Sequence, residues 1–150
     1  MTTPLVSVSP DGNRVKVPFA VPLHAVEDLE VDLMDDGLRI RATKGINRTD
    51  PYLPGHFPQF TIFPGVFMLE SVTQAVCLAL ADLSEGRPFL ESVVSARFLA
   101  PLLPGDIMTV NATIGPIVVD TVTVSASCER RGGTIAAKFK MRFRIARGRR

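Results

Sequence analysis

The chain has no tryptophan, one tyrosine, and only two histidines and two cysteines among its 150 residues. None of these falls in a C-x-x-C or H-E-x-x-H spacing, and the sequence has no glycine-rich phosphate loop. We therefore expect no metal site and no cofactor. Cys77 and Cys128 both lie in apolar patterns, which predicts reduced core residues and suits a cytosolic protein.

Long apolar runs are also missing. The charge-free stretch of the most apolar predicted helix, residues 71–81, is 11 residues long, whereas a membrane span needs about 20. The N-terminus has neither a basic nor an apolar signal-peptide region, so we expect no secretion and no membrane association. The composition, 46% hydrophobic and 21% charged, predicts one globular domain over residues 1–150, with an irregular segment over 1–24 and a basic tail over 146–150.

Acidic residues are absent from the end of the chain. Residues 1–129 have a net charge of −7, whereas residues 130–150 hold nine basic residues and no acid. Four of the nine alternate with apolar residues, which is typical of the solvated face of a strand: Lys138, Lys140, Arg142 and Arg144. The two aromatic residues of this segment, Phe139 and Phe143, fall on the apolar face of that strand and not among the basic side chains, so we expect no nucleic-acid partner.

The hydrophobic patterns predict strands before and after one helix. Pro64 favours a helix start at Gly65, and the helix is expected to run to about residue 83. A loop rich in proline precedes it over residues 47–63. The strands are expected over residues 15–19, 26–33, 38–46, 93–99, 107–114, 121–129 and 134–145, the last two joined by a Gly132-Gly133 turn. This order predicts an α+β fold in which an antiparallel sheet wraps around a buried helix.

Two residues stand out as candidates for chemistry, His56 in the loop and Glu70 on the apolar helix. A carboxylate on a buried helix is costly unless it is paired or used, and Glu70 shares one helical face with Thr73 and Gln74. The alternatives are a partly exposed or loop-capping Glu70 and a merely structural His56. The free N–H of Gly65 at the helix start would polarise a thioester carbonyl. A base, an acid and an oxyanion donor together suit α-proton removal with loss of a β-hydroxyl.

The stretch GHFPQFTIFPGVFMLESVTQA, residues 55–75, resembles the signature of the FabZ-type β-hydroxyacyl-(acyl carrier protein) dehydratases. It shares the GHFP, PGV and LE steps, with His56 eight residues before Pro64 and fourteen before Glu70. The stretch SARFLAPLLPGD, residues 95–106, resembles the family's second signature. The resemblance covers roughly residues 26–145.

The resemblance implies a hot-dog fold and a dimer with its active sites at the interface. It assigns His56 as the base, Glu70 of the partner chain as the acid, the Gly65 N–H as the oxyanion donor and Gln74 as the residue that orients Glu70. Val66 follows Gly65 where the isomerising relatives carry cysteine, so isomerase activity is not expected. The candidates for lining the acyl tunnel are Phe57, Phe63, Val66 and Phe98. The residues Gln59-Phe60-Thr61 depart from the common signature, which leaves the substrate's chain length open.

The sequence thus predicts a lyase that dehydrates a 3-hydroxyacyl thioester on an acyl carrier protein, in fatty acid or polyketide and polyene biosynthesis. A hot-dog acyl thioesterase and a non-catalytic subunit of a heterodimeric dehydratase are the alternatives. The expected partners are the carrier protein and a second hot-dog subunit, as a homodimer that can assemble into trimers of dimers or as a heterodimer. Because carrier proteins are acidic, three basic residues of the tail are candidates for docking them: Arg147, Arg149 and Arg150.

Overall fold

The computed structural model describes residues 7–8, 15–16, 23–81 and 83–148. Strands β1 (Ser7–Val8) and β2 (Val15–Lys16) form a small antiparallel pair near the N-terminus. The strand expected over residues 15–19 is therefore seen only as β2, since residues 17–19 lie outside the described residues.

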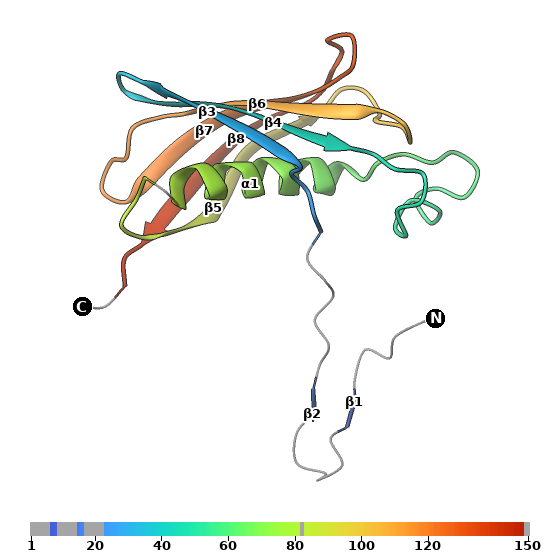
Figure 1. Cartoon of the computed structure of the whole chain (residues 1–150), viewed down its shortest axis with the longest axis horizontal. Helices are drawn as coiled ribbons and strands as arrows, with labels where there is room; N and C mark the ends of the chain where they lie inside the picture. Colours follow the sequence, from blue (N-terminus) through green and yellow to red (C-terminus); the bar gives the residue numbers. More distant parts are fainter. Residues whose placement is uncertain (1–6, 9–14, 17–22, 82, 149–150) are drawn as a thin grey trace.

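The main sheet has six strands in the order β3-β4-β6-β7-β8-β5, and every neighbouring pair is antiparallel. Helix α1 (Gly65–Ala81) lies against one face of this curved sheet (Figure 1). The strands are β3 (Asp28–Met34), β4 (Gly37–Gly45), β5 (Arg87–Phe98), β6 (Ile107–Ile114), β7 (Thr121–Arg130) and β8 (Ile135–Ala146). The predicted α+β hot-dog arrangement, a sheet wrapped around one helix, is confirmed.

The core forms where the alternating apolar positions of the sheet meet the helix. On β7 and β8 the predicted alternation is confirmed, because the apolar residues are buried and the basic residues of β8 are exposed. Ten buried residues illustrate the two layers, five from α1 and five from the strands: Met68, Val72, Ala75, Val76 and Ala79, with Ile40, Val110, Val124, Met141 and Phe143. No helix in the described ranges combines the length and apolarity needed to cross a membrane.

Strand β5 begins earlier than expected, at Arg87 rather than at residue 93. Proline has no N–H to donate to a neighbouring strand, so within sheets it is found mainly on edge strands. Strand β5 accommodates Pro88 because it is the edge strand beside β8. Gly86 precedes it at a point where a Cβ would collide with Ile145 of β8. Helix α1 also ends slightly before the expected residue 83, at Ala81.

Strand β5 runs back along α1 and is poorly covered within the chain. The Cys77 thiol lies 3.7 Å from the carbonyl oxygen of Pro88 near the start of β5, whereas Gly65 contacts Phe98 at its end. Most side chains of β5 are exposed, and the large apolar ones among them are Phe89, Val93, Val94 and Phe98, followed by Leu99. An exposed apolar edge of this kind is typical of an interface.

Candidate active site

The loop between β4 and α1 is held in place by the core and by local hydrogen bonds. Leu53 and Phe63 are fully buried and anchor its two halves. Between these anchors, the backbone N–H of His56 donates to the carbonyl oxygen of Leu53 at 3.0 Å, and the N–H of Ile62 donates to that of His56 at 2.8 Å. The N–H of Phe63 donates to the carbonyl oxygen of Leu102, which ties the loop to the segment after β5. The long proline-rich segment is thus an ordered platform for His56.

The imidazole of His56 is oriented by the backbone. Its Nδ1 lies 2.9 Å from the carbonyl oxygen of Ile62, and the ring stacks on Phe57 with centroids 4.4 Å apart. Because a carbonyl oxygen only accepts hydrogen bonds, Nδ1 carries the proton, which leaves the lone pair on Nε2 in the neutral ring. A half-buried histidine with a free Nε2 can accept a proton from a substrate.

His56 and Gly65 line the same open, apolar cavity of about 700 Å³. Pro64 ends the loop and Gly65 begins the helix, so the first N–H groups of α1 lie at the positive end of its dipole. The ring of Phe98 covers Gly65 so closely that a Cβ there would lie 2.7 Å from the ring. The cavity therefore brings together a base and a helix N-terminus under an apolar cover.

The carboxylate of Glu70 is held by Gln74. The side-chain amide of Gln74 donates to Glu70 Oε1 at 3.0 Å and to the carbonyl oxygen of Leu23 at 2.7 Å. The Gln74 oxygen accepts the backbone N–H of Ala25 at 3.1 Å. Both side chains are half-buried on α1. The predicted pairing of Gln74 with Glu70 is thus present in the structure, with two backbone anchors that no sequence pattern indicated.

Within one chain, His56 and Glu70 belong to separate surfaces. Glu70 does not line the cavity that holds His56 and Gly65. Among the described residues, neither a hydrogen bond nor an ion pair joins the two side chains. A single chain therefore presents the base with the helix N-terminus and presents the acid elsewhere along the helix.

The four tunnel candidates occupy different places. Val66 and Phe98 line the cavity of His56 and are 64% and 56% exposed in the single chain. Phe63 also lines it, but its side chain is fully buried and belongs to the core. Phe57 does not line the cavity; it stacks on His56 and is 54% exposed. These positions make Val66 and Phe98 the strongest candidates of the four.

The basic tail is only partly described. The guanidinium of Arg147 forms a 2.8 Å ion pair with Asp120, while Arg149 and Arg150 lie outside the described residues. Both cysteines are free thiols, and burial raises the pKa of Cys77 and that of Cys128, the latter to about 12. Glu70 contributes to the shift at Cys77, because its negative charge opposes a nearby thiolate. In the part of the chain that the structure describes, no three His, Cys, Asp or Glu residues cluster as metal ligands.

Comparison with known proteins identifies the family of the chain. The ApeI-like family, described as ApeI dehydratase, matches residues 33–141. A 3-hydroxyacyl-[acyl-carrier-protein] dehydratase FabZ from Thermotoga neapolitana is 34% identical over 136 residues, covering 87% of this chain and 93% of that protein. The FabZ of Ruminiclostridium cellulolyticum is 28% identical over 139 residues, covering 89% and 94%. The chain belongs to the FabZ-type dehydratase family.

The fold of this FabZ-type family member also occurs in solved thioesterase-like structures. A hypothetical thioesterase with coenzyme A from Streptococcus pneumoniae superposes with a TM-score of 0.61 at 15% identity, covering 83% of this chain and 93% of that one. At this level of identity the likeness shows the fold alone. The dehydratase relatives, rather than the thioesterase-like structures, carry the family assignment.

Proposed function

We propose that this protein dehydrates a 3-hydroxyacyl thioester carried on an acyl carrier protein to the trans-2-enoyl thioester. The observation that carries the proposal is the free Nε2 of His56 beside the N-terminus of α1 in one apolar cavity. The curated relatives with this activity in their names cover nearly the whole fold. Fatty acid biosynthesis is the setting that these relatives support; the specialised polyketide and polyene pathways are narrower versions of the same proposal.

In the proposed reaction, His56 Nε2 removes a proton from the α-carbon of the substrate. Charge develops on the thioester oxygen, which accepts a hydrogen bond from the Gly65 N–H. The bond between the β-carbon and its hydroxyl then breaks as the carboxylic acid of Glu70 donates a proton, so that water leaves and the double bond forms. Gln74 holds Glu70 in position through the three hydrogen bonds of its side chain.

We further propose that the acid comes from a second chain. Exposed apolar side chains lie on the β5 edge and beside it on α1, where Val66 shares a cavity with Phe98 and Leu78 shares another with Pro88. Pairing two β5 edges antiparallel about a two-fold axis places the partner's α1 beside the cavity of His56, since β5 runs back along α1 within each chain. The partner subunit's Glu70 would then complete the site. A related hot-dog chain with the same edge could take the partner's place.

The substrate is proposed to enter with its carrier protein at the open mouth of this cavity. Arg147 is occupied by Asp120, which reduces the charge that the described part of the tail offers to an acidic carrier. We keep Arg147, Arg149 and Arg150 as docking candidates. Reversing all three to glutamate should raise the KM for carrier-bound substrate and leave kcat unchanged.

The test is an assay of enoyl absorbance with 3-hydroxyacyl carrier proteins of several chain lengths. The wild type should form the enoyl thioester, and His56→Ala and Glu70→Gln should each reduce kcat at least about a hundredfold, as expected for lost general acid–base catalysis. Mixing the two variants should recover activity, because half of the sites in mixed dimers then keep an intact histidine and an intact acid.

A parallel assay of free thiol separates this reaction from thioester hydrolysis. Thiol release without enoyl formation would show a thioesterase instead. Activity retained in His56→Ala would contradict the proposed base. A lack of recovery in the mixture, with each variant folded, would place both residues of the site in one chain.

A further inference from the structure

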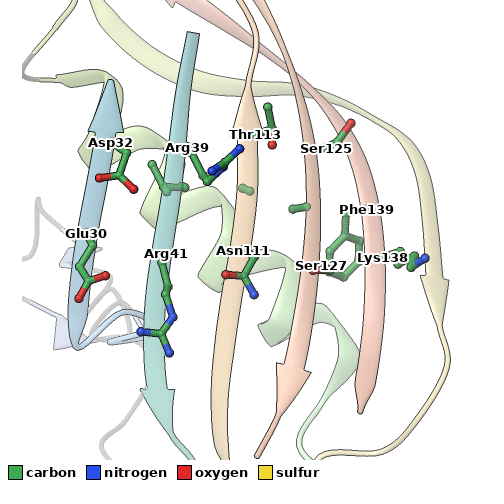
Figure 2. A pocket seen from close by; sticks show the side chains of 13 residues that line it. Glu30, Asp32, Arg39, Arg41, Asn111, Thr113, Ser125, Ser127, Lys138 and Phe139 are labelled. Carbon is green, nitrogen blue, oxygen red and sulfur yellow. The ribbon is translucent and has the colours of Figure 1, made fainter. Parts of the chain in front are cut away.

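The face of the main sheet that points away from α1 is hollowed into a shallow groove of about 490 Å³, which we call the outer groove (Figure 2). Its floor consists of short polar side chains on the two middle strands, Asn111 and Thr113 of β6 with Ser125 and Ser127 of β7. Longer charged side chains rise on both sides: Glu30, Asp32, Arg39 and Arg41 from β3 and β4, and Lys138 from β8.

The strand register arranges these side chains in two parallel rows. In the first row, directly paired residues are Glu30, Arg41, Asn111, Ser127 and Lys138. In the second row they are Asp32, Arg39, Thr113, Ser125 and Lys140. Over these five strands each row has the order acid, base, neutral, neutral, base. On the sixth strand, β5, Arg97 follows Lys138 and Ser95 follows Lys140. This repeated order is the observation on which the inference rests.

Within the described part of the chain, the charges of the rows are not used in ion pairs. Over the described ranges, the ion pairs are Lys44–Glu27, Arg144–Glu91 and Arg147–Asp120, and none includes a residue of either row. The acids of β3 lie across from the arginines of β4 and offset part of their charge. The lysines of β8 have no acid opposite them on β7, because β7 places Ser125 and Ser127 at those positions.

Each row is complementary in charge to the same row of a second chain that runs in the opposite direction across the sheet. A two-fold axis parallel to the strands and above β6 places β3 of one chain over β8 of another, β4 over β7, and β6 over itself. In the first row Glu30 then faces the partner subunit's Lys138, and Arg41 faces the partner subunit's Ser127. Asn111 faces its own counterpart, and a primary amide can donate and accept at the same contact.

We propose that the outer face of the sheet is a docking surface for a second copy of this chain, stacked sheet to sheet about this axis. The second row repeats the pattern, with Asp32 over the partner subunit's Lys140. An axis perpendicular to the strands would instead stack acids on acids and lysines on lysines, so charge selects the first orientation. The arginines of β4 in each copy, Arg39 and Arg41, then pack over the serines of β7 in the other copy.

This surface is separate from the one proposed to form the active site, which uses the β5 edge and the exposed face of α1. The two contacts use different elements of the fold, so one chain can make both at once. Loss of this contact is distinguishable from loss of the proposed activity, because the outer face carries no residue of the catalytic site.

The test is sedimentation of purified full-length protein at about 0.05 M and about 0.5 M salt, where screening lengths differ severalfold. At low salt, Glu30→Lys/Asp32→Lys and Lys138→Glu/Lys140→Glu should each lower the particle mass from the wild-type value to that of the pair formed through the β5 edges, and raise the dissociation constant of the outer contact at least about tenfold. High salt should weaken the wild-type assembly in the same direction. Enoyl formation per active site should be unchanged.

Two further samples restore the complementary charges. Mixing the two double variants places introduced lysines over introduced glutamates and native acids over native lysines, so the larger particle should return. A chain with all four substitutions should also recover it by itself. Asp35→Lys/Asp36→Lys, in the turn between β3 and β4, changes the net charge as much as the first variant does and should keep the wild-type mass.

Three results would overturn the proposal: equal masses of wild type and both double variants at low salt, no recovery in the mixture and the fourfold variant, or loss of mass in the turn control. A change in mass with the lysine reversal alone would point to a bound anion such as inorganic phosphate between the two basic walls, and would also overturn it.

Discussion

Gln74 lies one helical turn after Glu70 and donates a 3.0 Å hydrogen bond to its carboxylate. The same amide is clamped by the backbone of Leu23 and Ala25, so the clamp restricts where Glu70 can point. Glutamine suits this position because one planar group supplies two donors and one acceptor in fixed directions.

Gln74→Leu should therefore act mainly on catalysis. The variant keeps the side-chain size but leaves the Glu70 carboxylate without its guide, and we expect kcat to fall roughly tenfold with KM little changed. Unpairing the Leu23 and Ala25 backbone groups should also cost about 1–3 kcal/mol of unfolding free energy. Thr73→Val is the matched control, since among the described residues the Thr73 hydroxyl bonds only to the helix carbonyl of Leu69, and its kcat should stay near the wild type. Equal loss in both variants would contradict a specific role for Gln74.

The contact between Gly65 and Phe98 predicts a coupled effect on stability. Alanine normally favours a helix over glycine, but at this position its Cβ would press on the Phe98 ring. Gly65→Ala should lower the unfolding free energy by about 1–3 kcal/mol, as overpacking does. In a Phe98→Ala background the same substitution should be neutral or stabilising. A double-mutant cycle from urea denaturation measures this coupling, and additive effects would argue against it.

The two glycines at the ends of β4 should respond differently to alanine. A Cβ on Gly37 would collide with the backbone carbonyl oxygen of Ile114, which cannot move without disturbing β6. A Cβ on Gly45 would meet only the Glu27 carboxylate at 3.5 Å, an ordinary contact. We expect Gly37→Ala to lower the unfolding free energy by about 2 kcal/mol or more, and Gly45→Ala by less than about 1 kcal/mol. Similar melting temperatures for both variants would contradict the collision.

The buried Cys128 thiol predicts lower stability at alkaline pH. Its pKa is raised by burial to about 12, whereas an exposed thiol ionises near 8.5. The unfolded chain therefore loses this proton first, so the thiol's contribution is complete below about pH 8.5 and is lost as the pH rises toward 12. The unfolding free energy should fall over this interval, and Cys128→Ala should show a shallower fall. Identical pH slopes would show that other groups control it.

The sequence predicted those parts of the fold in which one face of a strand or helix is buried and the other is exposed to solvent. The alternation of β7 and β8 was readable because sheet side chains repeat every two residues. The start of β5 could not be read from the sequence, because β5 is an edge strand with register shifts between Leu90 and Ser92 and between Val93 and Ser95. These shifts and the lack of cover remove the alternation that marks a strand.

The candidate site also has contacts that the sequence predicts and contacts that it does not. The spacing of Glu70 and Gln74 is a local property of a helix, and their contact followed from it. The partners of Gln74 at Leu23 and Ala25 are backbone groups, which every residue has, so no residue type could mark them. The orientation of His56 by the Ile62 carbonyl escaped prediction for the same reason.

The clamp on Gln74 joins residues that are 49 and 51 positions apart, so it closes late in any folding route that begins with local structure. The segment of residues 23–25 enters the main sheet only at β3, an edge strand. Edge segments open with less free energy than a whole domain needs to unfold. Release of this one segment would disengage the acid while the sheet and helix remain intact, which makes catalytic activity a more sensitive reporter of partial opening than circular dichroism.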